Sequence, residues 1–393
     1  MYIFGKHRLQ IYIYLTMLYT RKLQKVLKNH LFKGKVVVLY GARQTGKTTL
    51  VKTIAEQSGK KYRLIDCELP ENQVLLSRRN TTDLFSLVEG YELVVFDEAQ
   101  AVQNIGQVLK SIHDHQPDIQ LLATGSSSFD LANLVSEPLT GRSFELTLYP
   151  LALAEVVDTQ FDATQKIYDA MRFGMYPDVQ HGTESDRVEK LRTLVSQYVY
   201  KNVLSVGGIR KPEIIMNLLR LLAHQIGSEV SLRELSGQLN TAPATVDRYL
   251  DLLEKNFVIV RLSGFATNMR NEVTRTRKIY FVDLGIRNAL ISAFAPIENT
   301  ARNDIGALFE NMFIIERKKY LGWSEDYLTS GHFWRTVSQQ EIDYVEQSGA
   351  TIRAYECKWG AHKTPSVPPQ FARSYPSASF DTVNEGNFFE LVS

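Results

Sequence analysis

Hydrophobic positions in the first third of the chain form short apolar runs, separated by segments long enough to be helices. The runs cover residues 35–40, 62–67, 93–96 and 120–124, and a helical pattern over residues 19–32 precedes them. Buried strands alternating with helices are typical of a parallel sheet covered by helices on both faces. The pattern therefore predicts an α/β core with these four runs as strands.

The middle of the chain has helical periodicity followed by two strand-like runs. We expect helices over residues 187–204 and 212–223, then a short helix that the capping box Ser231–Glu234 begins. Asn240 should make the next turn and Thr241 should cap the following helix. Strand-like runs at 257–262 and 278–282 complete the order helix, turn, helix and hairpin, which is typical of a winged helix.

The last third of the chain predicts one long helix and three strands. The helix covers residues 304–320, and the strands cover 332–337, 341–346 and 351–359. Alternation along the last strand places Glu356 and Lys358 on the same face.

Length and composition fit a multidomain globular protein. The chain has 393 residues, 44% hydrophobic and 22% charged, with a net charge of +2 that points to no particular partner. Its two cysteines, Cys67 and Cys357, match no metal-binding spacing. We therefore expect a reduced, cytoplasmic location.

The amino terminus contains an apolar stretch, residues 11–19, that is too short to span a bilayer. A secretory signal is one alternative, although no small-residue cleavage site follows. We favour the other, in which Met17 is the natural start and residues 1–16 are an extension. No membrane association is expected.

A glycine-bounded loop lies between the first predicted strand and the next helix. Strand, G-x-x-x-x-G-K-T and helix is the context of a P-loop, whose amides bind phosphate oxygens. Lys47 would reach the β- and γ-phosphates of ATP, and Thr48 would hold Mg²⁺. The expected nucleotide-binding residues are Gly41, Ala42, Arg43, Gln44, Thr45, Gly46, Lys47, Thr48 and Thr49.

Five residues at three further places in the chain extend this site. Asp97 and Glu98 end the third strand, where Asp97 would bind Mg²⁺ and Glu98 would polarise the attacking water. Thr124 and Ser126 follow the fourth strand and suit sensing of the γ-phosphate, with ordinary turn chemistry as the alternative. Arg142 is either a catalytic arginine for its own or a neighbouring subunit, which would require an oligomer, or a structural surface residue.

The winged helix gives a divided signal for DNA binding. Its second helix presents charged residues with a net charge of −1, which suits base reading poorly. These residues are Asp247, Arg248, Asp251, Glu254 and Lys255. The hairpin loop instead carries the basic residues Arg270, Arg275, Arg277 and Lys278. Both a DNA-contacting wing and a structural connector remain open.

A second set of charged residues lies near the carboxyl terminus. Strand pairing would bring Asp343 near Glu356, and Glu310 on the preceding helix could join them. Such carboxylates suit Mg²⁺, with Mn²⁺ as an alternative, and Lys358 could activate a metal-bound water. The competing interpretations are a solvated strand face, or a nuclease-like fold that does not cleave.

These motifs together resemble the AAA-type ATPases that carry a DUF4143 domain. They are Gly-Ala-Arg-Gln-Thr-Gly-Lys-Thr-Thr-Leu at 41–50, Phe-Asp-Glu-Ala-Gln at 96–100, Thr-Gly-Ser-Ser at 124–127, Leu-Thr-Gly-Arg at 139–142, Tyr-Phe-Val-Asp-Leu-Gly at 280–285, Phe-Glu-Asn at 309–311 and Glu-Ile-Asp-Tyr-Val at 341–345. The resemblance covers nearly the whole chain after Met17. One departure is Asn202, where relatives tend to carry an acidic residue.

The resemblance implies a P-loop AAA+ core with a helical lid, a winged helix and a C-terminal restriction-endonuclease-like domain of the PD-(D/E)XK type. Glu310, Asp343, Glu356 and Lys358 match the motif of that last domain. The expected boundaries are 1–16 for the extension, 17–155 for the core, 156–205 for the lid, 206–275 for the winged helix and 276–393 for the nuclease-like domain.

The function expected from these features is Mg²⁺-dependent ATP hydrolysis that controls a nuclease-like domain acting on DNA. One alternative is a non-cleaving, ATP-driven switch that uses the nuclease fold to recognise a partner, including a protein partner. The other is a DNA-binding regulator that acts through its winged helix.

Overall fold

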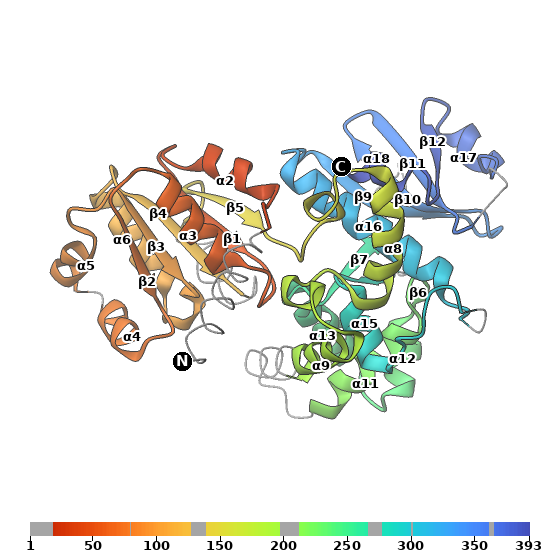
Figure 1. Cartoon of the computed structure of the whole chain (residues 1–393), viewed down its shortest axis with the longest axis horizontal. Coiled ribbons are helices and arrows are strands. Elements are labelled where there is room, and N and C mark those ends of the chain that lie inside the picture. Colours follow the sequence, from red (N-terminus) through yellow and green to blue (C-terminus); the bar gives the residue numbers. More distant parts are fainter. Residues whose placement is uncertain are drawn as a thin grey trace, which may run out of the picture.

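The computed structural model describes residues 19–78, 80–126, 139–196, 212–265, 277–299, 302–360 and 365–393. Its named strands form sheets of five, three and four strands. Figure 1 shows the five-stranded sheet and its helices, coloured red to yellow, beside the remainder of the chain, coloured yellow-green to blue. The molecule is thus α/β, with a parallel core and an additional C-terminal sheet, as the sequence predicted.

The five-stranded sheet is parallel, in the order β2-β3-β4-β1-β5. Its strands are β1 (Val36–Tyr40), β2 (Tyr62–Asp66), β3 (Leu93–Asp97), β4 (Gln120–Gly125) and β5 (Ser143–Thr147). The four predicted strands are confirmed. Strand β5 was not predicted, because this edge strand is only partly buried and has no continuous apolar run.

Helices cover both faces of this sheet. They are α2 (Leu23–His30), α3 (Lys47–Gln57), α4 (Pro70–Ser77), α5 (Thr81–Val88) and α6 (Ile105–His115), with the 3₁₀ helix η1 (Ala99–Ala101) after β3. Alternate residues of β1 enter different cores: Val37 and Leu39 pack with α2 and α3, whereas Val36 and Val38 pack with α4 to α6. The two-sided burial explains why the central strands are apolar at every position.

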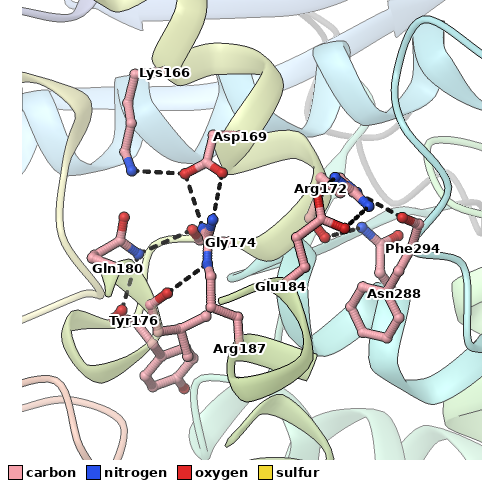
Figure 2. A network of polar contacts seen from close by, with 11 residues as sticks. Lys166, Asp169, Arg172, Gly174, Tyr176, Gln180, Glu184, Arg187, Asn288 and Phe294 are labelled. Atoms are coloured by element: carbon pink, nitrogen blue, oxygen red, sulfur yellow. Dashed lines mark hydrogen bonds and ion pairs between the residues drawn. The ribbon is translucent and has the colours of Figure 1, made fainter. Parts of the chain in front are cut away.

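The chain leaves the sheet through η2 (Leu153–Glu155) and enters a helical group made of α8 (Gln160–Phe173), η3 (Pro177–Gln180) and α9 (Glu184–Leu194). Figure 2 shows the polar network that holds this group together. Arg187 on α9 pairs with Asp169 on α8 at 2.6 Å, and Arg172 on α8 pairs with Glu184 on α9 at 2.5 Å. The predicted helix at 187–204 therefore begins earlier than expected, at Glu184, and its second half lies outside the described residues.

The helical group docks closely on α15 (Leu284–Ile291). Asp283 caps α15 by accepting a hydrogen bond from Ile286 N and also accepts one from Met175 N, at 2.6 Å. A Cβ atom on Gly174 would lie 2.0 Å from the Asp283 carboxylate. This close approach requires glycine and joins the helical group to the next part of the chain.

The winged helix has the predicted order of elements. It comprises α11 (Pro212–His224), β6 (Glu229–Val230), α12 (Leu232–Gln238), α13 (Pro243–Lys255), β7 (Ile259–Ser263) and β8 (Arg277–Phe281). Ser231 caps α12, as expected, but Thr241 does not cap α13. That helix begins one residue later, after Ala242, because Pro243 presets the backbone angle of its first turn.

The expected boundary at residue 275 falls before β8, although β8 pairs with both β6 and β7. The hairpin of the winged helix therefore extends to Phe281. The remaining domain boundaries stay predictions.

The C-terminal domain packs one long helix against a mixed sheet. The helix is α16 (Ile305–Trp323), and the sheet contains β9 (Thr329–Arg335), β10 (Glu341–Ser348), β11 (Thr351–Cys357) and β12 (Ser379–Val383), with α17 (Pro369–Ser374) and α18 (Phe388–Val392) alongside. Phe313 of α16 contacts the rings of Tyr344 and Tyr355 on the sheet. The helix and the first three strands were predicted, whereas β12, α17 and α18 were not.

In the described segments, no helix is both long enough and apolar enough to cross a bilayer.

Candidate nucleotide site and C-terminal carboxylate cluster

The P-loop lies between the end of β1 and the first turn of α3. A Cβ atom on Gly41 would lie 2.2 Å from the Leu148 carbonyl oxygen, so only glycine fits there. Gly46 adopts the left-handed conformation, with φ of 92°, and α3 begins at the next residue. The two glycines thus bring the loop main chain to a helix amino terminus, which suits phosphate binding.

Lys47 is buried within this loop. Its ammonium donates hydrogen bonds to the carbonyl oxygens of Gly41 and Ala42, both at 2.9 Å, and lies 3.7 Å from Glu98. Burial lowers the pKa of Lys47, while the nearby Glu98 and Asp97 carboxylates oppose that shift. The lysine is therefore held at the mouth of the loop with a cation-stabilising carboxylate close by.

The Asp97 carboxylate, at the end of β3, accepts hydrogen bonds from side chains of both α3 and β4. Thr48 Oγ1 donates to one Asp97 oxygen at 2.8 Å, and Thr124 Oγ1 donates a short hydrogen bond to the other. The Thr124 hydroxyl also accepts the backbone N–H of Glu98, at 3.0 Å. The two predicted Mg²⁺ ligands, Thr48 and Asp97, are thus already together, so the residues present fit a Mg²⁺–nucleotide complex.

Gln100 is a member of this site that the sequence analysis did not identify. Its side-chain amide donates to Glu98 at 2.6 Å and to Ser126 at 3.1 Å. Glu98 itself has a φ of 49°, a strained value for a residue with a side chain. Gln100 therefore orients the predicted catalytic carboxylate, and its position two residues after Glu98 was the available signal.

The other predicted nucleotide-binding residues line the loop. Thr45 is buried and its hydroxyl donates to Ala42 O at 2.9 Å, while Thr49 is exposed on α3. Arg43 lies 3.5 Å from Glu68 on the surface. Gln44 faces a cleft of about 440 Å³ that α9 also lines. The P-loop thus lies open toward the helical group.

Arg142 lies at the opposite end of the sheet from the P-loop. Its carbonyl oxygen accepts from Val36 N at 2.9 Å, and its guanidinium donates to Asp114 at 3.2 Å. β1 then rises roughly 13 Å, at about 3.3 Å per residue, before the P-loop begins after Tyr40. Arg142 does not approach the P-loop of its own chain, so only its intersubunit role, and the oligomer that this role requires, stays a prediction.

The C-terminal domain brings the three predicted carboxylates near one another. Burial and the negative charges of Glu310 and Glu356 raise the pKa of Asp343 to about 8. Asp343 accepts the backbone N–H of Cys357 at 2.8 Å. One Glu356 oxygen pairs with Lys358 at 2.7 Å, and the other is buried without a hydrogen-bond partner among the described residues.

Lys278 supplies a buried cation to this cluster. Its ammonium lies 3.2 Å from Glu310 and 2.5 Å from Glu341, and Tyr280 donates to the same Glu310 oxygen at 2.5 Å. Lys278 was expected among the basic residues of the hairpin loop, which a DNA-contacting wing would use, but the residue lies in β8, is 3% exposed and faces inward. Arg270 and Arg275 lie outside the described residues.

The cluster has the donor types that Mg²⁺ prefers but lacks their convergence. In the described part of the chain, no three His, Cys, Asp or Glu side chains approach closely enough to hold a metal ion. Lys278 on Glu310 and Lys358 on Glu356 already supply positive charge. The arrangement does not fit a resident metal ion, so metal ligation by Glu310, Asp343 and Glu356 stays a prediction.

Comparisons with protein families cover most of the chain. A model described as an AAA domain matches residues 33–157, and the domain of unknown function DUF4143 matches residues 305–387. The chain thus contains an AAA domain and a DUF4143 domain. A further domain of unknown function, DUF8612, matches residues 164–297, which includes the helical group and the winged helix.

The chain is also similar to individual proteins. It is 28% identical to an uncharacterized protein of Mycobacterium tuberculosis, over 90% of this chain and 76% of that protein. It is 23% identical to an uncharacterized protein of Haemophilus influenzae, over 84% of this chain and 85% of that protein. The Walker-type ATPase of Pyrococcus abyssi aligns at 16% identity and a TM-score of 0.46, over 69% of this chain and 93% of that one.

Acidic side chains of α13, the second helix of the winged helix, form ion pairs with the hairpin of the same module. Arg261 on β7 pairs with Asp251 and Glu254 on α13, both at 2.5 Å, and lies 3.7 Å from Asp247. The acidic residues of α13 thus hold the helix to its own hairpin. This arrangement favours the structural-connector alternative over base reading by α13.

Proposed function

We propose that this chain binds ATP with Mg²⁺, hydrolyses it, and uses its nucleotide state to control the DUF4143 domain. The observation that carries the proposal is the joining of Thr48, Asp97 and Thr124 beneath Lys47. Asp97 and Thr124 lie at the carboxyl ends of the neighbouring strands β3 and β4, and Thr48 lies in the first turn of α3, the helix that follows β1 on the other side of β4.

Each residue has a distinct role in this proposal. Lys47 would bind the β- and γ-phosphates, and Thr48 and Asp97 would hold Mg²⁺, whose positive charge would offset the negative charge of the phosphates. Glu98, oriented by Gln100, polarises the attacking water. Thr124 keeps Asp97 and the Glu98 backbone in register.

The test is ATP turnover by the Lys47→Ala protein. We expect turnover to fall to background, since no other lysine approaches the loop carbonyls that Lys47 contacts among the described contacts. Lys52→Ala, on the exposed side of α3, serves as the matched control and should retain native turnover. Equal hydrolysis by the Lys47→Ala and native proteins would refute the assignment.

The finer proposal for the output is that the DUF4143 domain acts on DNA. The cleaving version would require Glu310, Asp343 and Glu356 to rearrange so that they could hold Mg²⁺ or Mn²⁺, with Lys358 placed to stabilise charge on the phosphate. The buried ammonium of Lys278 between Glu310 and Glu341 favours the second candidate, a non-cleaving switch that uses this fold for recognition.

DNA cleavage assays separate these two candidates. Native and Asp343→Ala proteins would be incubated with linear, circular and single-stranded DNA in the presence of Mg²⁺ or Mn²⁺. Metal-dependent cutting that Asp343→Ala abolishes would support the nuclease. The absence of any Asp343-dependent cutting would leave the recognition switch.

A further inference from the structure

Arg21, just before α2, makes three contacts that no sequence motif predicted. Its guanidinium donates to the P-loop carbonyl of Thr45 at 2.7 Å, to the Tyr149 carbonyl at 2.7 Å and to Glu155 at 3.0 Å. The residue is 8% exposed, so the planar fork is enclosed by its partners. Arg21 therefore joins the P-loop to the segment by which the chain leaves the ATPase sheet.

The same exit segment, residues 149–155, is held from its other side by α16 of the DUF4143 domain. Glu316 accepts the backbone N–H of Leu153 at 2.7 Å. Lys319 donates to the Leu151 carbonyl at 2.8 Å and to Glu316 at 2.6 Å. Both side chains are buried, so the exit segment lies between two enclosed charged groups.

A small cavity confirms that the two sets of contacts share one location. It measures about 20 Å³ and is lined by Arg21 and Glu155 on one side and by Lys319 and Trp323 on the other. Helix α16 also contacts α2, the helix that follows Arg21. A shift of the exit segment would displace groups on both sides.

Helix α16 extends this connection to the carboxylate cluster. Glu310 lies six residues before Glu316, roughly 9 Å along the axis at about 1.5 Å per residue. Phe309 and Phe313 pack this part of the helix into the domain core. A rotation or translation of α16 would therefore move Glu310 relative to Asp343 on the sheet.

The P-loop contacts explain how nucleotide could begin such a movement. Lys47 donates to the carbonyl oxygens of Gly41 and Ala42, so it must change these bonds to contact a phosphate. Ala42 O also accepts the Thr45 hydroxyl, and Thr45 O accepts Arg21. A change at Lys47 thus reaches Arg21 through two adjoining hydrogen bonds.

We propose that Arg21 is a positioning residue that transmits the nucleotide state of the P-loop, through Glu155 and the exit segment, to α16. The proposal deepens the proposed function and rests on it, since it requires nucleotide binding at the P-loop. It assigns the control of the DUF4143 domain to contacts within one chain, independent of any neighbouring subunit.

Hydrogen exchange of peptides covering residues 305–323 provides the test. The native protein would be compared with and without a saturating, non-hydrolysable ATP analogue and Mg²⁺. We expect the analogue to change exchange in these peptides by about fivefold or more, the lower range of ordinary allosteric coupling. In Arg21→Met this difference should fall below about twofold, although a fluorescent ATP analogue still binds.

Two further variants make the result specific. Glu155→Gln removes the charge that pairs with Arg21, so it should also reduce the nucleotide-dependent difference in hydrogen exchange. This variant keeps the test available if Arg21→Met does not fold. Arg172→Met removes another partly buried arginine that pairs with a carboxylate and a carbonyl, Glu184 and Phe294 O, away from the P-loop. It should retain the native difference.

The outcomes distinguish the two proposals. A full nucleotide-dependent difference in nucleotide-bound Arg21→Met or Glu155→Gln would overturn the role of Arg21. A native protein that binds the analogue without any change at residues 305–323 would overturn the link but leave the ATPase assignment. A native protein that binds no ATP analogue would overturn both.

Discussion

At the scale of single residues, the candidate ATPase site depends on hydroxyl groups as much as on charges. The Thr124 hydroxyl bonds simultaneously to Asp97 and to the backbone of Glu98, so it helps to set the separation of the two carboxylates for which we propose metal binding and water polarisation. An aliphatic side chain of equal shape would leave the packing of β4 intact and remove both bonds. We therefore expect such a substitution to lower the rate of ATP hydrolysis more than the affinity for nucleotide.

Thr124→Val should lower kcat for ATP by about 10- to 100-fold, the effect of losing a positioning bond in a preorganised site, while nucleotide affinity changes by less than about threefold. Steady-state hydrolysis and fluorescent-nucleotide titration measure the two quantities. Thr164→Val removes a comparable hydroxyl on α8 and should behave as native. An unchanged kcat in Thr124→Val would contradict the assigned role.

Glu98→Gln should retain ATP binding and lower kcat by about 10²- to 10⁴-fold, because the amide cannot act as the general base. Gln100→Ala should produce a smaller loss, of about tenfold, since Glu98 keeps its charge but loses its orienting amide. Single-turnover hydrolysis at saturating ATP would compare the three proteins. A Gln100→Ala protein as fast as the native one would show that the contact is dispensable.

At the scale of elements, ion pairs fasten the helical group that lies beside the P-loop. Asp169 on α8 accepts two hydrogen bonds from Arg187 on α9 and also pairs with Lys166, as Figure 2 shows. Because α8 also docks on α15 through Gly174 and Asp283, the group cannot move without the winged helix behind it. This helical group is better described as part of a larger body than as an independent flap.

Asp169→Asn should reduce the free energy of unfolding by about 1–2 kcal/mol at pH 7, a partly exposed ion pair being worth less than a fully buried one. Burial acts to raise the pKa of Asp169, but the bonds from Arg187 and Lys166 outweigh it and the pKa is lowered. The folded protein therefore favours the ionised carboxylate. Its contribution is present above the unfolded-state pKa of about 3.9 and is lost as pH falls through the lower folded value.

Urea unfolding between pH 7 and pH 3 would measure this difference, which should shrink toward the acid end. Asp178→Asn is the control, because Asp178 makes a more exposed pair with Lys190 and should change stability by less than about 0.5 kcal/mol. A difference for Asp169→Asn that grows as pH falls would contradict the assignment.

At the scale of the whole molecule, the winged helix and the DUF4143 domain form one continuous unit. Lys278 of β8 reaches Glu310 and Glu341 of the C-terminal domain, and Arg335 of β9 pairs with Glu229 of β6 at 3.3 Å. The ATPase sheet instead meets this unit through the exit segment and α16, as the separation in Figure 1 illustrates. The boundary between the ATPase sheet and this unit, where we propose that nucleotide changes the contacts, therefore lies next to Arg21.

Lys278→Met should lower the free energy of unfolding by about 3 kcal/mol, since the largely enclosed Glu310 and the partly exposed Glu341 would remain near each other without their cation. If Lys278 occupies the place of a metal ion, Mg²⁺ or Mn²⁺ should raise the Tm of this variant more than that of the native protein. Thermal unfolding with and without each ion provides the measurement. Arg277→Met, at the exposed start of β8, is the control; an equal metal effect on native and Lys278→Met proteins would contradict the resident-cation role.

Local sequence determined the parts of this protein whose residues lie next to one another along the chain. The P-loop is a contiguous loop between a buried strand and a helix, and Asp97 and Glu98 terminate an apolar run, so spacing and periodicity were sufficient to identify them. The winged-helix order and the strands that carry Asp343 and Glu356 followed from the same short-range rules.

Only the tertiary structure decided which distant charges meet. Arg21 reaches Glu155, Lys278 turns inward to Glu310, and Arg142 lies at the far end of the sheet from Lys47. Strand order and helix docking determine these distances, and residues far apart in sequence carry no local signal of them. For this chain, the sequence alone therefore determined the nucleotide-binding motif and the types of its elements, whereas long-range packing decided how that motif connects to the C-terminal domain.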